Sequence, residues 1–151
     1  MNEIETNKVY ELEREIMKMP QVDCPIREFF ADGLYIREMT IPAGTVATGA
    51  LHKKGHANII TKGHFIVHTK DGAFEYEAPQ TIISTDNTKK AVYAITETVW
   101  SSIHATDKTD TAEIVKELTD STLEQLIGGK ENLQLQKEKE RWHLAFQQEH
   151  G

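Results

Sequence analysis

The chain carries two successive patterns of hydrophobic and polar positions. In residues 1–19, apolar side chains recur at spacings close to three and four, with Glu and Lys between them. These side chains are Ile4, Val9, Leu12, Ile16 and Met19. The spacing is typical of an amphipathic helix, and Pro20 is expected to end it. We predict an N-terminal helix within residues 1–20 that packs on the rest of the chain or on a partner subunit.

Between residues 33 and 106 the pattern changes to short β-favouring runs separated by turn residues. Asp71 and Gly72, for example, lie between two alternating runs, which is a strong indication of a hairpin. The expected strands span 34–41, 45–51, 58–61, 65–69, 74–77, 81–84, 91–95 and 98–105. Many short strands with no long helix among them predict a mainly β barrel or sandwich over residues 21–106.

The sequence from residue 107 onward is charged and has a helical pattern. Two segments, 110–113 and 121–124, begin with Asp or Ser and end with Glu, which is the spacing of a capping box. The Gly pair at 128–129 is expected to end a short helix. A last helix over 130–149 has only a thin apolar stripe, typical of a helix that docks on another surface of its own chain or of a second subunit. We therefore treat residues 107–151 as a helical C-terminal arm.

Composition limits the classes of function. A chain of 151 residues suits one domain, and no apolar stretch approaches the roughly 20 residues that a membrane-spanning helix needs. The formal net charge of −7 argues against general binding to a nucleic-acid backbone, which requires clustered Lys and Arg. The N-terminus lacks the basic start and apolar run of a secretory signal. The single cysteine, Cys24, excludes an internal disulfide and is expected to be a small buried residue.

The segment 49–63 resembles the first sequence motif of the cupins. That motif has a Gly, two His separated by one residue, a Glu a few residues on, and a Gly seven residues beyond the Glu. When the segment is aligned on Gly63, His56 stands at the Glu position, His52 at the second His and Ala50 at the first His. The second cupin motif, Pro-x-Gly-x-x-His, would fall near residues 85–90, where Lys90 stands at the His position.

A longer resemblance joins several short segments in order. Residues 20–25, 33–38, 41–45, 93–94 and 98–104 resemble a group of uncharacterised cupin-like proteins encoded by tailed phages and prophages. The resemblance covers about residues 15–110. It implies a cupin-type, jelly-roll-like β-barrel and a viral origin, with the protein in the host cytoplasm or in the virion. It implies no settled activity.

Three histidines form the candidate metal site. His52 and His56 lie on either side of a Lys-Lys-Gly turn, and His104 shares one face of the last expected strand with Trp100 and Ser102. Neutral imidazoles from neighbouring strands of a barrel can bind a divalent metal such as Fe, Mn, Ni or Zn. The alternative is that these histidines are polar barrel lining, hydrogen-bonded to Asn58 or to backbone carbonyls.

Lys90 suggests a second use of the same region. If its side chain points inward, it forms with His52, His56 and either Lys62 or Arg37 a pocket suited to a small anion such as a carboxylate, sugar acid or phosphate. If it points outward, Lys89 and Lys90 are a solvated turn. The complete set of candidate ligand-binding residues is His52, His56, Asn58, Lys90, Tyr93 and Trp100. His64 and His68 alternate with apolar Phe65 and Val67, so we expect these two histidines on the surface.

Two functions follow as hypotheses. The phage-like resemblance and the helical segments favour a non-enzymatic phage protein, either a virion or assembly component or an accessory factor that binds a host molecule. Such a protein would be a homo-oligomer or part of a larger viral assembly, joined through its helical arms. The histidine cluster favours instead a metal-dependent cupin enzyme of isomerase, epimerase or dioxygenase type that acts on a small molecule.

Overall fold

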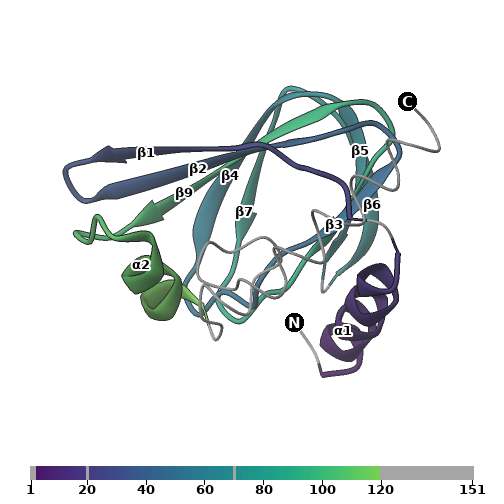
Figure 1. Cartoon of the computed structure of the whole chain (residues 1–151), viewed down its shortest axis with the longest axis horizontal. Coiled ribbons are helices and arrows are strands. Elements are labelled where there is room, and N and C mark those ends of the chain that lie inside the picture. Colours follow the sequence, from purple (N-terminus) through teal and green to yellow (C-terminus); the bar gives the residue numbers. More distant parts are fainter. Residues whose placement is uncertain (1–2, 20, 70, 120–151) are drawn as a thin grey trace.

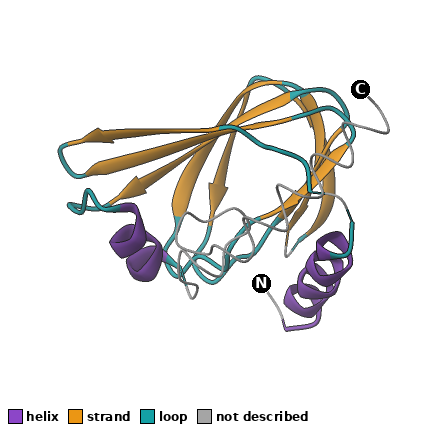
Figure 2. Ribbon diagram, in the orientation of Figure 1, coloured by secondary structure: helices purple, strands orange, loops and turns teal. Residues whose placement is uncertain are grey.

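Two antiparallel sheets form the body of the molecule. The computed structural model describes residues 3–19, 21–69 and 71–119. Within these residues, one sheet has five strands in the order β1-β2-β9-β4-β7, and the other has four in the order β3-β8-β5-β6. The sheets curve around one another as a barrel, with α1 and α2 at its periphery (Figures 1 and 2). The expectation of a mainly β barrel preceded by a helix is confirmed.

The strands are short and follow the chain closely. Their bounds are β1 Ile26–Ala31, β2 Leu34–Ile41, β3 Thr45–Thr48, β4 His56–Lys62, β5 His64–Thr69, β6 Gly72–Glu77, β7 Gln80–Ser84, β8 Ala91–Ala94 and β9 Thr98–Ala105. The helices are α1 Glu3–Met17 and α2 Thr111–Leu118. All eight expected runs lie within or overlap observed strands, because their alternating pattern matches the two-residue period of a strand.

The hydrophobic core lies between the two sheets. Ile41, Ile60 and Trp100 come from the five-stranded sheet, and Phe65 and Val67 come from the four-stranded one. The Phe65 ring meets the Trp100 ring edge-on, with centroids 5.6 Å apart. Burial of this apolar surface, at about 25 cal/mol per Å², drives the two sheets together. Cys24 packs against this core as expected, but it is only partly buried.

The core fixes the direction of the side chains along β5. Phe65 and Val67 are fully buried, while His68 is exposed and His64 lies near the surface, where its Nε2 atom is 3.3 Å from Glu75. The expectation that these two histidines face outward is confirmed.

The sequence pattern missed one strand. β1 pairs with β2 and is the edge strand of the five-stranded sheet, and the β1–β2 hairpin projects from the barrel (Figure 1). Both of its faces are largely exposed, including Phe29 and Phe30. A strand exposed on both faces has no reason to alternate polar and apolar residues, so periodicity could not reveal it.

The strand expected at 45–51 is shorter than predicted. β3 ends at Thr48, and the next residues form a loop that leads to β4. β4 in turn begins at His56, two residues earlier than expected. The loop therefore carries His52, and the following strand carries His56 from its first residue.

Polar contacts attach α1 to the barrel and cap the first turn of α2. In α1, Glu13 accepts a hydrogen bond from the Thr48 hydroxyl and pairs with the buried Lys89, whose Nζ lies 3.1 Å away. Asp110 is the N-cap of α2 and its side chain accepts a hydrogen bond from the backbone N–H of Glu113, which is one of the two bonds of the expected capping box. The second box, the Gly pair and the last expected helix lie outside the described residues. No helix among the described residues is long and apolar enough to cross a membrane.

Gly63 marks the point where the chain passes from one sheet to the other. Its φ is +116°, a conformation that favours glycine. A Cβ added here would lie 2.7 Å from the Cα of Thr98 and 2.8 Å from the carbonyl oxygen of Glu97. Gly63 thus permits a close backbone approach that no other residue allows, which is the physical role of the motif glycine found in the sequence.

Candidate metal centre

A row of polar and aromatic residues crosses the inner face of the five-stranded sheet near one end of the barrel. Tyr35 on β2 pairs with His104 on β9, and His56 on β4 pairs with Ser84 on β7. The pairing of Ala57 with Ile103 continues the register and sets His56 beside His104. Residues opposite one another in antiparallel strands share a face of the sheet. The two histidines therefore point to the same side as the buried Trp100.

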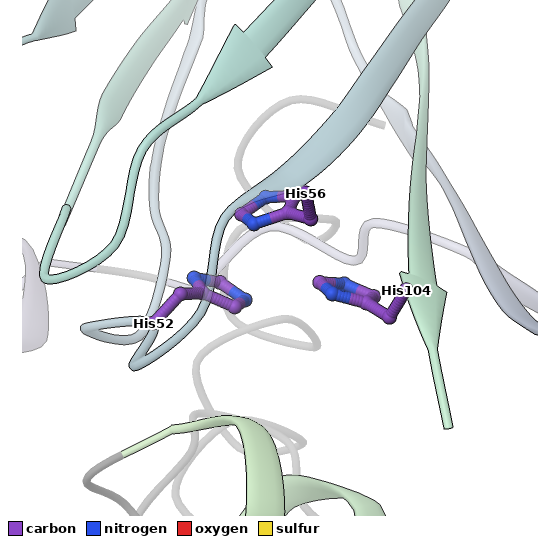
Figure 3. Close-up of side chains that lie close together, drawn as sticks. All are labelled: His52, His56 and His104. Carbon is purple, nitrogen blue, oxygen red and sulfur yellow. The ribbon is translucent and has the colours of Figure 1, made fainter. Parts of the chain in front are cut away.

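His52 completes the cluster from the loop after β3. Its backbone N–H donates to the carbonyl of Thr88 at 3.0 Å, and a second bridge joins it to Thr119. Its ring centroid lies 4.4 Å from that of His56 and 5.3 Å from that of His104, and the last two centroids are 4.5 Å apart. One nitrogen from each ring lies within 4.8 Å of the others. Figure 3 shows the three rings turned toward a common space, as the sequence predicted.

Asn58 supports the cluster from the next row of the sheet. Its side chain is fully buried, donating from Nδ2 to Ser84 Oγ at 2.9 Å and to the carbonyl of Ile82 at 3.0 Å. Its Oδ1 accepts from Trp100 Nε1 at 3.0 Å and from Ser102 Oγ at 3.2 Å. Because every polar atom of its amide is used within the protein, Asn58 serves to position its neighbours, and Trp100 is part of the core.

The three imidazoles are held in their neutral form. Burial, reinforced by the positive charge of neighbouring groups including Lys90, lowers the pKa of His52 to about 2, of His104 to about 3 and of His56 to about 4. At neutral pH each ring therefore keeps one lone pair for a ligand, which is the form that binds a metal.

One of these ring nitrogens lacks a hydrogen-bond partner. His52 Nδ1 is buried and makes no hydrogen bond of ordinary length to the described residues, and only the Ala50 backbone acts on this ring as a hydrogen-bond partner. A buried polar atom left without a partner costs about 1–3 kcal/mol. A metal ion bound by one nitrogen from each of the three rings would offset part of the cost of burying these polar atoms. Three imidazoles form a donor set suited to Zn, Fe, Ni or Cu and leave open coordination positions, so the residues present fit a divalent metal.

Lys90 points into this region and is no solvated turn residue. It is partly buried, and its Nζ donates to Ser84 Oγ at 2.7 Å and lies 3.5 Å from His56 Nε2. Burial lowers the pKa of Lys90 to about 8. Its neighbour Lys89 is also buried, but is turned toward α1. The sequence left two orientations open for the Lys90 side chain, and the structure favours the inward one.

Of the remaining candidate residues, Tyr93 and Lys62 lie away from the cluster, whereas Arg37 lies close enough to act on it. Tyr93 is 41% exposed and alternates with the buried Val92 and Ala94, so it lies on the outer face of β8 and is not brought to the cluster. Lys62 is exposed at the far end of β4, where it pairs with Glu97. Arg37 pairs with Ser102, and its charge contributes to the low pKa of His104.

The contacts that cover the cluster were not visible in the sequence. The Tyr35 ring stacks on the His104 ring, with the ring centroids 6.1 Å apart. Tyr35 also packs in a buried group with Ile114 and Leu118 of α2. The carboxylate of Glu28 accepts hydrogen bonds from the hydroxyls of Tyr35 and Thr111, both at 2.8 Å. α2 thus lies against this end of the barrel (Figure 1), and only the apolar spacing of its short sequence could have indicated it.

Several cupins are among the solved structures to which this chain is similar. An ectoine synthase from P. lautus has 15% identity and a TM-score of 0.52, with 66% of this chain and 75% of that chain covered. A cupin superfamily protein from Desulfitobacterium hafniense has 10% identity and a TM-score of 0.49, with 58% and 81% covered. An RmlC-like cupin from Methanocaldococcus jannaschii has 14% identity and a TM-score of 0.48, with 56% and 82% covered.

These comparisons establish the fold alone. No family model and no curated protein matches the sequence. The architecture is that of a cupin-type β-barrel with an N-terminal helix, as the sequence motifs implied. Since one fold hosts many activities, function has to be argued from the histidine cluster itself.

Proposed function

We propose that this chain is a metal-dependent cupin in which His52, His56 and His104 hold one divalent transition-metal ion and a small molecule binds at the open coordination positions. The observation that carries the proposal is the convergence of three neutral imidazole nitrogens within 4.8 Å of one another. A bound ion of this kind acts as a Lewis acid on an oxygen ligand or lowers the pKa of a bound water.

The contribution of the protein is to position the ligands. His56 and His104 stand on adjacent central strands of the sheet, and His52 is held by its backbone bonds to Thr88 and Thr119. The buried Asn58 fixes the row below through four hydrogen bonds. Ligands placed on strands and supported from beneath keep their geometry without reorganisation on binding.

An enzyme is the first candidate because three protein ligands are typical of catalytic sites, whereas structural sites usually have four. The reaction type would be that of an isomerase, epimerase or dioxygenase. A non-enzymatic phage protein, assembled through its helical segments, is the second candidate, and the sequence resemblance to phage-encoded cupins favours it. Only the first candidate requires a bound metal, so the site is the element to test first.

Titration with Co²⁺ followed by visible absorption tests the site. Wild-type protein should develop d–d bands that saturate at about one ion per chain. The His104→Gln variant should lose these bands, while His68→Gln, which alters an exposed histidine outside the cluster, should keep them. Absence of bands in the wild type, or their persistence in the His104 variant, would refute the proposed site.

A further inference from the structure

Lys90 places a positively charged group beside the proposed ligands of a metal cation. We infer that the three-histidine site takes its metal ion together with a small carboxylate anion, and that the Lys90 ammonium couples the binding of the two. The inference rests on the proposed metal site and adds the chemical class of its second ligand.

The first observation concerns the hydrogen bonding of His56. Its Nδ1 faces the carbonyl of Lys54 at 3.5 Å, which favours the proton on that nitrogen. The lone pair is then on Nε2, the atom that lies 3.5 Å from Lys90 Nζ. A metal that binds His56 through Nε2 displaces the hydrogen that Lys90 directs at it. Lys90 gives a different hydrogen to Ser84, so it competes with the metal for this nitrogen as long as no further group accepts the hydrogen that it directs there.

The second observation concerns charge. Among the described residues, the groups that bring charge to the three neutral histidines are Lys90 and Arg37, and no carboxylate acts on them. Among the described residues, the nearby Glu28 is already bonded to Tyr35 and Thr111. A divalent ion in the cluster would thus stand beside an ammonium without a protein anion to offset either charge. Like charges repel strongly when they are shielded from water.

The third observation concerns geometry. Ser84 holds Lys90 Nζ at 2.7 Å, so the ammonium stays at the edge of the cluster. Two cationic points a few ångström apart match a carboxylate, which can direct one oxygen to each of them. The packing of α2 against Tyr35, which stacks on His104, favours a small anion over a bulky one. Bound in this way, the carboxylate gives Lys90 a new acceptor and offsets the charge of the metal.

Two measurable consequences follow. Because binding free energies are reciprocal, an anion that strengthens metal binding is itself bound more tightly when the metal is present. Removing the charge at position 90 should weaken this coupling, and it should also strengthen metal binding in the absence of the anion.

The experiment is a Co²⁺ titration of the full chain at pH 7, in acetate or in methanesulfonate at equal ionic strength, with the Co²⁺–acetate equilibrium taken into account. Wild-type protein should bind Co²⁺ at least about tenfold more tightly in acetate, which is about 1.4 kcal/mol. Lys90→Met and Lys90→Gln should show less than about a threefold difference and bind Co²⁺ more tightly than wild type in methanesulfonate. Lys62→Met, which removes an exposed lysine at the far end of β4, should behave as wild type.

The outcomes separate the two proposals. If wild-type protein binds no Co²⁺ in either buffer, the metal site itself is wrong. If it binds Co²⁺ equally well in both buffers, the metal site stands and the coupled carboxylate is wrong. If the Lys90 variants bind Co²⁺ more weakly than wild type in methanesulfonate, Lys90 is a metal ligand rather than a competitor, and the inference is overturned.

Discussion

The indole Nε1 of Trp100 donates a hydrogen bond to Oδ1 of Asn58 at 3.0 Å. This bond joins the hydrophobic core, to which Trp100 belongs, to the row of polar residues just below the histidines. Because both side chains are buried, the bond has no water to replace it if one partner is lost. The stability of the barrel and the geometry of the histidine cluster therefore both depend on Asn58.

Replacing Asn58 by Ala should lower the free energy of unfolding by about 2–4 kcal/mol, since it leaves Trp100 Nε1 without an acceptor and removes buried volume. Urea denaturation measures this change. Ser102→Ala removes only one of the bonds to Asn58 Oδ1 and should cost about 1 kcal/mol or less. Equal losses in the two variants would contradict the central role of Asn58.

The glycine at the passage between the sheets offers a matched pair of variants. Gly63 and Gly72 both have a φ of +116°, but a Cβ at Gly63 would meet the Thr98 backbone, whereas a Cβ at Gly72 has nothing within 4 Å. Gly63→Ala should therefore destabilise the protein by at least about 2 kcal/mol more than Gly72→Ala, since only it adds a backbone clash to the conformational strain. Thermal unfolding of both variants checks the difference, and similar midpoints would show that the close approach is unimportant.

The metal-free protein should lose stability as the pH falls below about 6.5. The pKa values of His52, His56 and His104 are lower in the folded chain than in the unfolded one, so the unfolded chain binds more protons in this range. Their stabilising contribution is complete above pH 6.5 and declines as the pH falls toward 4, by up to about 1.4 kcal/mol per pH unit for each histidine.

Urea unfolding in the presence of a chelator, at intervals from pH 7.5 to 4.5, measures this slope. His52→Gln should give a shallower slope, because it removes one of the three groups. His68→Gln should leave the slope unchanged, because His68 is exposed and outside the cluster. A wild-type stability independent of pH between 7 and 5 would contradict the buried, neutral state of the cluster.

Lys90 should destabilise the metal-free protein at pH 7. Its pKa falls from 10.5 to about 8 on folding, so below pH 8 the folded chain bears the cost of a buried ammonium. Lys90→Met should therefore raise the free energy of unfolding by about 1–3 kcal/mol, and the gain should shrink as the pH rises from 8 to 10.5. Unfolding in urea at several pH values tests this, with Lys62→Met as the exposed control. A loss of stability in Lys90→Met would mean that its bond to Ser84 outweighs the cost of burial.

The fold was predictable wherever a strand has one buried face. Phe65 and Val67 alternate with His64 and His68, and that alternation alone determined which side of β5 faces the core. The same reasoning placed His104 on the inner side of β9, where Trp100 is buried. It failed for β1, whose two faces are both exposed and whose sequence therefore shows no period.

The candidate site was predictable in its histidines but not in their surroundings. The spacing of His52 and His56 across a short turn, and the motif resemblance, were visible in the sequence. The direction of the Lys90 side chain was not, because it depends on a hydrogen bond to Ser84 on a strand that is not its own. The sequence also does not give the orientation of β8, and the structure places the candidate Tyr93 on its exposed face, outside the site.

Metal content tests the central claim most directly. Protein purified without chelators or a metal-affinity tag, equilibrated with Mn²⁺, Fe²⁺, Ni²⁺ or Zn²⁺ and then freed of unbound ions, is analysed by elemental mass spectrometry. The account predicts about one ion per chain for wild type and near zero for His52→Gln and His104→Gln, with His68→Gln equal to wild type. No bound metal in the wild type, or retention of metal in both cluster variants, would contradict it.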